Sequence, residues 1–542
     1  MPSQAAAHDR AFEDRASENS EVPDHQRPVI VVGGGISGLT CAAYLACSGV
    51  PVKVLEARTQ LGGTSERVRA LGAEFVPADS RGRFNSTVAD ELDLRRHGLI
   101  ASVADDPSLA MSWLGGDPFL RFASEAATHD ALRATHRYEV ANYTRYLEAA
   151  KPVIELLQEM SRTDTRTLPL RRLLDRRGSA AATLAKWSRR SAADVLRSYF
   201  ETEPFRSAAV VRGPVAAGRS PDLPGSGLSA LEYALSHSDL TATTGAGSVS
   251  VSAALASVIG ENGGSIVTSA SVSRIVADTN GVHSVVVESG EEYESGCVVV
   301  ACDPRRALLQ CLKPAPAVAA SLMRRAEATP VSEGHVARID AVLTDVPPRR
   351  ADVTAALGRC GIAGDLQSAL VMTPGATALS NGFRLLRHGA IAQRPPMVIS
   401  VGCGADSTNA TPPSTLSIEL LHAPHELSGG WPGSAEPARW IELAADAFGR
   451  DLAAAVSGWR ITTPADFDAD GQRPYRQQGL AATAALGAVP RRHRHDDHAT
   501  PVDGLFLCAA ADTMLPQSIV DPGRSAAGQI LRTLGADLTA AA

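Results

Sequence analysis

The amino-acid sequence predicts an α/β protein made of more than one domain. The chain has 542 residues, which is more than one hydrophobic core normally covers, so two or three domains are expected. Near its start, a strand, a glycine-rich turn, a helix and a second strand follow one another within residues 28–56. Near its end, residues 504–511 form another apolar strand pattern, followed by a helix pattern. We therefore expect one parallel-sheet domain that is built from separated segments of the chain.

A glycine-rich turn follows the first expected strand, Val29–Val32. Gly33, Gly35 and Gly38 have the spacing G-x-G-x-x-G. The first glycine permits a tight turn, the second lets the backbone approach a pyrophosphate, and the third lets the next helix pack against the strand. The amino end of that helix, expected at 39–46, offers free N–H groups and the positive end of its dipole to phosphates.

An acidic residue, Glu56, ends the second expected strand, which covers 52–55. Its carboxylate can accept hydrogen bonds from a ribose. Because strand, turn, helix, strand and acid are all in register, the unit predicts a dinucleotide site, whereas a lone glycine triplet would be weak evidence. A second glycine pair, Gly62 and Gly63, follows shortly after Glu56. This extension resembles that of large FAD enzymes and is usually missing from NAD dehydrogenases. FAD is therefore the expected cofactor, and no second such unit indicates a separate NAD(P)H domain.

The middle of the chain reads as helices followed by sheet. Apolar residues recur at helical spacing within 130–210, including 137–160 and 192–205. Helices inserted between parts of a nucleotide domain suggest a cap over a substrate cavity. Further helices are expected at 249–260, 438–456 and 523–534, and strands within 265–278, 282–289, 296–304, 335–345, 397–404 and 415–427.

Four aromatic residues of the expected cap have two interpretations. Tyr143, Tyr146, Tyr199 and Phe200 either line the substrate cavity or pack in the core of the cap. Core packing is favoured, because large aromatic side chains are above all a means of burying apolar area.

Several segments resemble one family, the phytoene desaturase-like flavin oxidoreductases, which include the carotenoid desaturases. The matching pieces run in family order from about residue 28 to 535. The first glycine unit is shared by all flavoproteins of the glutathione-reductase type, so the narrower resemblance depends on the later pieces. The matching pieces are, in order, VVGGGISGLTCAAYL, VLEARTQLGG, SAADVLRSYFETEPFRSA, SIVTSASVSRIVAD, VVVACDPRRAL, TLSIELLHAPHEL, WRITTPADF and VDGLFLCAAAD.

The resemblance implies an FAD-binding Rossmann-like domain of the glutathione-reductase type, with an inserted substrate domain of sheet plus helical cap. It implies that the strand of Val272 contacts the adenine end through its backbone. It also implies that Asp512 and the helix start at Pro522 and Gly523 come to the flavin, where a helix amino end stabilises the reduced ring. The expected cofactor-binding residues are Gly33, Gly35, Ile36, Ser37, Gly38, Glu56, Ala57, Arg58, Gly62, Gly63, Thr64, Val272, Ala511, Asp512, Ile519, Pro522 and Gly523.

The segment from Cys508 to Gln517 departs from the family pattern. Family members usually read something like C-G-A-G-T-H-P-G-G-G, whereas this chain reads CAAADTMLPQ. Glycine-to-alanine changes add a methyl group and restrict positive φ. Three interpretations stay open: a bound flavin with a reshaped substrate face, which is favoured; a flavin kept for a non-redox role; and a scaffold that has lost the flavin.

Composition excludes some classes of function. The net charge of −7 argues against a general nucleic-acid binder. Residues 1–27 are polar and lack the pattern of a signal peptide, so a disordered leader is expected. No apolar run is long enough to span a bilayer, although contact with a membrane surface stays open. The eight cysteines form no C-x-x-C pair, so buried free thiols and a cytoplasmic location are expected.

Two groups of histidines are candidate functional residues. His493, His495 and His498 lie among arginines and aspartates, where a solvated loop is favoured over a metal site. His422 and His425 are candidate bases, although surface or packing roles are favoured. Asp521 and Arg524, like Asp512, either cap and pair or act at the flavin.

The expected function is that of an FAD-dependent oxidoreductase, a dehydrogenase or desaturase in biosynthesis. It removes hydride from a C–H bond of a mainly apolar small molecule and passes electrons to oxygen or a quinone-like acceptor. A flavin oxidase or monooxygenase and a non-catalytic scaffold are the alternatives, and no catalytic residue is assigned. The expected divisions are a leader (1–27), FAD-binding segments (28–125, 241–312 and 457–542), a helical cap (126–240) and a substrate domain (313–456).

Overall fold

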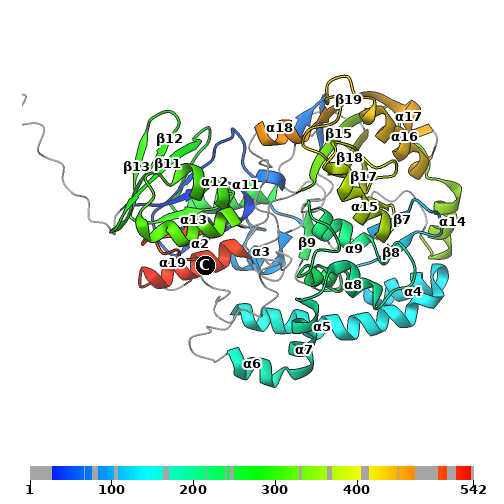
Figure 1. Cartoon of the computed structure of the whole chain (residues 1–542), viewed down its shortest axis with the longest axis horizontal. Coiled ribbons are helices and arrows are strands. Elements are labelled where there is room, and N and C mark those ends of the chain that lie inside the picture. Colours follow the sequence, from blue (N-terminus) through cyan, green and yellow to red (C-terminus); the bar gives the residue numbers. More distant parts are fainter. Residues whose placement is uncertain are drawn as a thin grey trace, which may run out of the picture.

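A computed structural model gives the fold of most of the chain (Figure 1). It describes residues 27–65, 68–75, 84–102, 108–162, 170–216, 218–238, 241–244, 249–328, 333–362, 369–403, 414–449, 451–469, 498–508, 521–536 and 538. The expected leader, apart from residue 27, lies outside these residues.

The nucleotide domain contains a parallel sheet assembled from three distant parts of the chain. Its strand order is β10-β2-β1-β14-β20, and all the strand pairs are parallel. Both faces of the sheet are buried, which explains the continuous apolar sequence of its strands. The strands are β1 (Val29–Val32), β2 (Val52–Leu55), β10 (Ser265–Val267), β14 (Val298–Val300) and β20 (Leu505–Leu507).

Different elements cover the two faces of this sheet. Three helices pack on one face, and a three-stranded antiparallel sheet with a helix covers the other. The expected helix at 39–46 is present and begins three residues earlier. The helices are α2 (Ile36–Cys47), α11 (Val251–Glu261) and α19 (Pro522–Thr533), and the opposite face has β11 (Val272–Asp278), β12 (Gly281–Val287), β13 (Glu292–Glu294) and α13 (Ala320–Ala328).

A second domain is built on a seven-stranded sheet with the order β19-β15-β18-β17-β16-β7-β8. One face packs against α16 (Glu436–Phe448) and α17 (Asp451–Ala455). The helix expected at 438–456 is thus two helices, because the chain breaks at Gly449 and residue 456 already belongs to a strand. The strands are β7 (Ser108–Ser112), β8 (Phe119–Arg121), β15 (His335–Leu343), β16 (Leu370–Thr373), β17 (Met397–Cys403), β18 (Ser414–Ala423) and β19 (Val456–Thr462).

The expected division into segments stays a prediction, but the topology of this sheet bears on two of its limits. β7 and β8 lie within 28–125, yet β7 pairs with β16 of the second domain. β19 begins at the limit between 313–456 and 457–542 and pairs with β15.

The cap is helical, and its aromatic residues form its core. Tyr143, Tyr146 and Phe200 are at most 1% exposed, and Tyr199 packs against them, so the core-packing interpretation holds. The main helices are α4 (Glu125–Thr135), α5 (Val140–Arg162), α6 (Leu170–Arg176), α7 (Gly178–Trp187) and α8 (Ala192–Arg197). In Figure 1 these helices lie beneath the seven-stranded sheet.

The helix expected at 192–205 is wrong beyond Arg197. Glu139 explains the early end, because its Oε1 atom accepts hydrogen bonds from the backbone N–H groups of Glu201 and Thr202 at 2.8 and 2.7 Å. Those amides are therefore not available to a helix, and Pro204 has no N–H to donate.

The remaining elements are two further helices, α14 (Ala351–Arg359) and α15 (Ala376–Leu386), and several shorter helices and strands. The shorter ones are α3 (Ser86–Glu91), α9 (Ala208–Val210), α10 (Glu232–Leu235), α12 (Pro304–Arg306), α18 (Pro464–Ala469), β3 (Val68–Ala70), β4 (Ala73–Phe75), β5 (Phe84–Asn85), β6 (Ala101–Ser102) and β9 (Thr241–Thr244). Within the described ranges, no helix is both long and apolar enough to cross a bilayer.

Candidate cofactor site

The turn between β1 and α2 requires glycine at two of its three motif positions. Gly33 has φ +111°, and a Cβ atom there would lie 3.1 Å from the carbonyl of Ala301. A Cβ atom on Gly38 would lie 2.2 Å from the carbonyl oxygen of Gly33. The third position differs, since a Cβ atom on Gly35 would meet no atom within 4 Å. The fold thus explains Gly33 and Gly38, whereas Gly35 leaves space open beside the turn.

The amino end of α2 is available to an anion. Its N-cap residue, Gly35, has no side chain that could cap the helix, and no acidic residue lies in the first turn. The first N–H groups of a helix have no partner within the helix, and its amino end carries a partial positive charge. Ile36 and Ser37 begin this turn. An open space, free amides and a positive dipole end fit a pyrophosphate.

Glu56 lies beside the same turn. It is 8% exposed. Its Oε2 atom accepts a hydrogen bond from the Gly34 amide at 2.6 Å, and its Oε1 atom accepts one from the Arg58 amide at 2.9 Å. A carboxylate oxygen can accept more than one hydrogen bond, so each oxygen can still receive a ribose hydroxyl. Ala57 lies between the two residues of the second bond, in the bend that follows β2.

The second glycine pair comes back to the first turn. The Gly62 amide donates to the carbonyl of Gly34 at 2.9 Å, and Gly62 pairs with Gly35 as an isolated bridge. A Cβ atom on Gly63 would lie 3.3 Å from the Cα atom of Gly35. Thr64 follows in a short 3-10 helix. The strand-end acid and both glycine motifs therefore surround one place at the carboxyl edge of the sheet.

Val272 begins β11, close to the segment of Glu56. The amide of Ala270 donates to the carbonyl of Glu56 at 2.8 Å, and the amide of Ser269 donates to the carbonyl of Arg58 at 2.9 Å. The start of β11 thus lies along the acid end of the site. The side chain of Val272 is buried in the core beneath the sheet. Its role toward the adenine end, through the backbone, stays a prediction.

The amino end of α19 meets the amino end of α2. A Cβ atom on Gly523 would lie 2.3 Å from the carbonyl oxygen of Ser37, so Gly523 lets the two helices touch. Pro522 opens the helix, and the Asp521 carboxylate caps it by accepting from the Arg524 amide at 3.0 Å. Burial raises the pKa of Asp521 to about 6.

Three expected site residues, Ala511, Asp512 and Ile519, lie outside the described residues. The altered segment 509–517 lies there as well.

A partly buried ion pair joins α19 to α3 of the nucleotide domain. Arg524 donates from Nε and one Nη atom to both carboxylate oxygens of Glu91, at 2.6 and 2.8 Å. Tyr44, on α2, donates to the same carboxylate at 2.6 Å. Burial raises the pKa of Tyr44, and the Glu91 carboxylate raises it further. Capping and pairing are therefore the observed roles of Asp521 and Arg524. Sequence reasoning missed Glu91 and Tyr44, because no local spacing relates Glu91 to a partner 433 residues away.

The histidines of interest are placed in packing or structural roles. His422 is 1% exposed and lies against Phe383 and Gly382, where burial lowers its pKa to about 3. His425 lies 3.6 Å from Asp468 in an ion-pair arrangement. His498 is buried and is hydrogen-bonded to the carbonyl of Leu507 at 2.7 Å. His493 and His495 lie outside the described residues, within which no cluster of metal-ligating side chains occurs.

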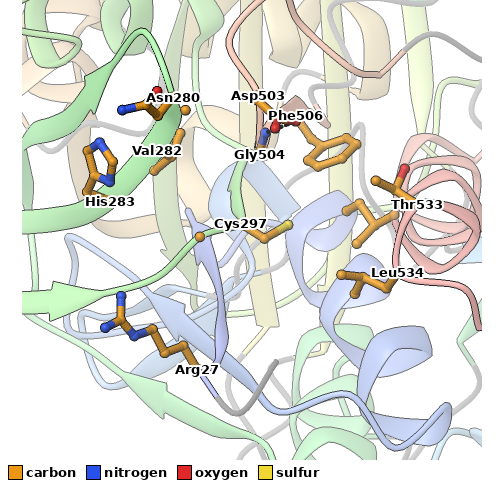
Figure 2. A pocket seen from close by; sticks show the side chains of 13 residues that line it. Arg27, Asn280, Val282, His283, Cys297, Asp503, Gly504, Phe506, Thr533 and Leu534 are labelled. Atoms are coloured by element: carbon orange, nitrogen blue, oxygen red, sulfur yellow. Dashed lines mark hydrogen bonds between the residues drawn. The ribbon is translucent and has the colours of Figure 1, made fainter. Parts of the chain in front are cut away.

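A pocket of about 550 Å³ lies away from this site (Figure 2). Arg27, Cys297 and Gly504 line it, and each directly precedes a strand of the parallel sheet or lies within two residues of its start. The pocket is therefore at the amino edge of the sheet, whereas cofactors of such folds bind at the carboxyl edge. Burial raises the pKa of the Cys297 thiol to about 12, so this thiol is not a ready nucleophile.

Two parts of the chain match models of known families. Residues 31–92 match an NAD(P)-binding Rossmann-like domain, and residues 111–338 match flavin containing amine oxidoreductase. The chain is an FAD-dependent oxidoreductase. This oxidoreductase has a mixed α/β fold with a Rossmann-like FAD-binding domain and a substrate domain, of the amine oxidase type. The predicted cofactor, FAD, and the predicted enzyme class, an FAD-dependent oxidoreductase, are confirmed.

Individual relatives agree with this assignment. The oxidoreductase is 25% identical to the mouse protein named pyridine nucleotide-disulfide oxidoreductase domain-containing protein 2, over 93% of each chain. A putrescine oxidase variant redesigned in its cofactor binding shares the fold, with a TM-score of 0.57 and 15% identity over 94% of this chain and 98% of the other.

The narrower resemblance to phytoene desaturases has local support only. A carotenoid 3,4-desaturase of Haloarcula japonica is 51% identical over 47 residues, which are 9% of this chain and 10% of the relative. That resemblance therefore stays a prediction.

Proposed function

We propose that this oxidoreductase removes hydride from a C–H bond of a small molecule with a mainly apolar body, and so introduces a double bond. The observation that carries the proposal is the meeting of the two domains. β18 of the seven-stranded sheet contacts β4, the hairpin strand that follows the glycine pair at 62–63. The sheet of the substrate domain therefore adjoins the segment that leaves the cofactor site.

The residues at the turn fit the cofactor. The amides at the amino end of α2 would hold the pyrophosphate, and Glu56 would hold the ribose of the adenosine half. The open space beside Gly35 is where the backbone would come closest to the phosphates. When bound, FAD supplies a two-electron acceptor for the hydride, while a proton leaves the neighbouring substrate atom.

The cap supports an apolar substrate body. On one face of the seven-stranded sheet, Ala110, Val371, Val398 and Leu421 are buried against the cap helices. This half of the sheet has no charged group among those side chains. An apolar substrate entering between cap and sheet would gain from leaving water, by about 25 cal/mol for each Å² of apolar surface that it buries.

An amine is the second candidate substrate. The match of residues 111–338 to flavin containing amine oxidoreductase favours it. The chemistry is related, since a C–H bond beside nitrogen loses hydride and a C=N bond forms as the nitrogen loses a proton. A desaturase of purely apolar molecules and an oxidase of amines therefore differ in the atom next to the C–H bond. Reoxidation by oxygen, with or without product hydroxylation, separates oxidase and monooxygenase from dehydrogenase.

Anaerobic reduction of the bound flavin tests the proposal. The purified holoprotein is mixed with apolar alkenes, polyenes, alkylamines and acyl compounds, and the absorbance near 450 nm is followed. Bleaching by at least one C–H donor, with a stoichiometric unsaturated or imine product, is the expected result. A flavin that dithionite reduces but no member of the panel bleaches would contradict the proposed substrate class.

We also infer a cytoplasmic location for this protein. Cys41 and Cys311 are free thiols, and both are buried. Free thiols of this kind are typical of a reducing compartment. Fractionation of cells that make the protein tests this inference.

A further inference from the structure

The cap-facing side of the seven-stranded sheet is divided into an apolar half and a charged half. Strand alternation puts Ala337, Ile339 and Ala341 of β15 in the core beneath the sheet. Arg338 and Asp340 therefore lie on the opposite face. The register of β15 with β18 sets Arg338 opposite Glu419 and Asp340 opposite Ser417. All four of these side chains are at most 5% exposed.

Both carboxylate oxygens of Asp340 have partners. Its Oδ1 atom accepts from the Ser417 hydroxyl at 3.1 Å and lies 3.2 Å from the Nε atom of Arg338. Its Oδ2 atom accepts from Arg460, on β19, at 3.0 Å. Asp340 is completely buried, so these contacts compensate for the loss of water around its charge. Asp340 thus orients Arg338 and offers little further capacity for hydrogen bonding.

Arg338 retains unused donors. Its Nε atom lies 3.2 Å from an oxygen of Asp340 but is buried without a hydrogen-bond partner among the described residues. Its guanidinium carbon lies 5.8 Å from the ring centre of Phe467, on α18. A buried guanidinium with five N–H groups is costly to leave without acceptors. The geometry of its terminal nitrogens suits two parallel hydrogen bonds to a carboxylate.

A second buried donor lies on the same face. Ser400, on β17, is opposite Ser417 in register, and its hydroxyl has no hydrogen-bond partner among the described residues. Val398, two residues earlier on the same strand, belongs to the apolar half packed against the cap. Polar and apolar halves therefore meet along β17 and β18, and β18 contacts β4 beside the cofactor segment.

We propose that Arg338 anchors a carboxylate at one end of the substrate, whose apolar body extends toward the cap half of the sheet. This inference rests on the proposed function and deepens it, since the substrate becomes an amphipathic carboxylate. Asp340 holds the guanidinium in place, and Ser400 lies in the adjoining row of the same face. Glu419 is the opposing charge across from Arg338, and Arg460 is the second cation that offsets it.

Titration of the holoprotein with sodium octanoate and, separately, with octylamine tests the anchor. Binding is read from the perturbation of the flavin absorption spectrum, so turnover is not needed. Octanoate is expected to bind more tightly than octylamine. Arg338→Met is expected to weaken octanoate binding by about tenfold or more, which is the effect of losing hydrogen bonds to a charged group. Arg338→Lys keeps the positive charge but loses the paired donors of the guanidinium. Its affinity for octanoate is expected to lie between those of the wild type and Arg338→Met.

Two matched variants separate this role from a structural one. Arg460→Gln removes the other partner of Asp340 and is expected to change octanoate binding less than Arg338→Met does. Glu419→Gln removes the opposing charge and is expected to strengthen it. Each variant is compared at full FAD occupancy and unchanged thermal midpoint. Preference for octylamine, or equal octanoate binding by wild type and Arg338→Met, would overturn the anchor.

Failure of the anchor is distinguishable from failure of the proposed function. If a C–H donor bleaches the flavin but octanoate does not bind, only the proposed role of Arg338 is contradicted. If octanoate binds through Arg338 but no substrate bleaches the flavin, the role of Arg338 is supported and the proposed reaction is contradicted.

Discussion

Replacing Gly35 by alanine separates what the fold requires from what the cofactor requires. The added methyl group would meet no protein atom within 4 Å. Gly35 has φ −69° and ψ 168°, an extended conformation that alanine adopts without strain. Alanine is a poorer N-cap residue than glycine, but it also lowers the entropy of the unfolded chain, and both effects are about 0.5–1 kcal/mol. We therefore expect the free energy of unfolding of the apoprotein to change by less than about 1 kcal/mol.

The effect of Gly35→Ala on FAD is expected to be much larger. The methyl group would occupy the open space at the amino end of α2, where the pyrophosphate is expected. Losing one charge-assisted hydrogen bond to a phosphate costs about 1.5–3 kcal/mol, which is about 10- to 150-fold in Kd.

Isothermal titration of the apoprotein with FAD, together with urea unfolding, measures both quantities. Gly260→Ala is the matched control, because its added methyl group also meets no atom but lies in α11, away from the turn. Gly38→Ala is the opposite control and is expected to destabilise the fold itself, since its Cβ atom would lie 2.2 Å from a backbone oxygen. Unchanged FAD affinity in a stable Gly35→Ala variant would refute the assignment of this turn to the pyrophosphate.

Three other changes give separate outcomes. Glu56→Gln is expected to weaken FAD binding about tenfold or more, measured by the same titration. The glutamine side chain has one accepting oxygen, whereas both oxygens of Glu56 accept hydrogen bonds, from the amides of Gly34 and Arg58, and would also bind a ribose. Equal affinity would contradict the ribose role. Gly523→Ala is expected to lower the free energy of unfolding by about 1–3 kcal/mol in urea, by forcing α19 off α2, and an unchanged value would show that the helices do not touch there. His422 is neutral when folded, with a pKa of about 3, so the unfolded chain binds the extra proton between about pH 3 and 6.5 and stability falls as the pH falls through that window. His422→Leu is expected to remove about 1.4 kcal/mol of the loss in unfolding free energy between pH 7.5 and 5.5, and an unaltered pH profile would contradict the buried neutral imidazole.

The cofactor site was predictable where its chemistry is local in sequence. Gly33, Gly38 and Glu56 lie within one strand–turn–helix–strand unit, and close backbone contacts require the two glycines. The second glycine pair was recognised as a feature of large FAD enzymes, but the return of Gly62 to this turn is seen only in the folded structure. The open space at Gly35, by contrast, is a property of the folded turn and cannot be inferred from the types of residue in the sequence.

The substrate side was not predictable in the same way. Arg338, Asp340 and Arg460 come together through strand pairing between distant segments, and in the sequence they are ordinary charged residues of alternating strands. The end of α8 at Arg197 was also not predictable. The carboxylate of Glu139, which accepts hydrogen bonds from the amides of Glu201 and Thr202, comes from a distant part of the sequence. Tertiary contacts of this kind override local helix patterns.

The most direct test of the central claim is an absorption spectrum of the purified protein, followed by heat release and identification of the bound cofactor. We predict a flavin spectrum and release of FAD at about one molecule per chain. A colourless protein that added FAD does not reconstitute would contradict the account, and the turn around Gly35 would then have to be explained without a cofactor.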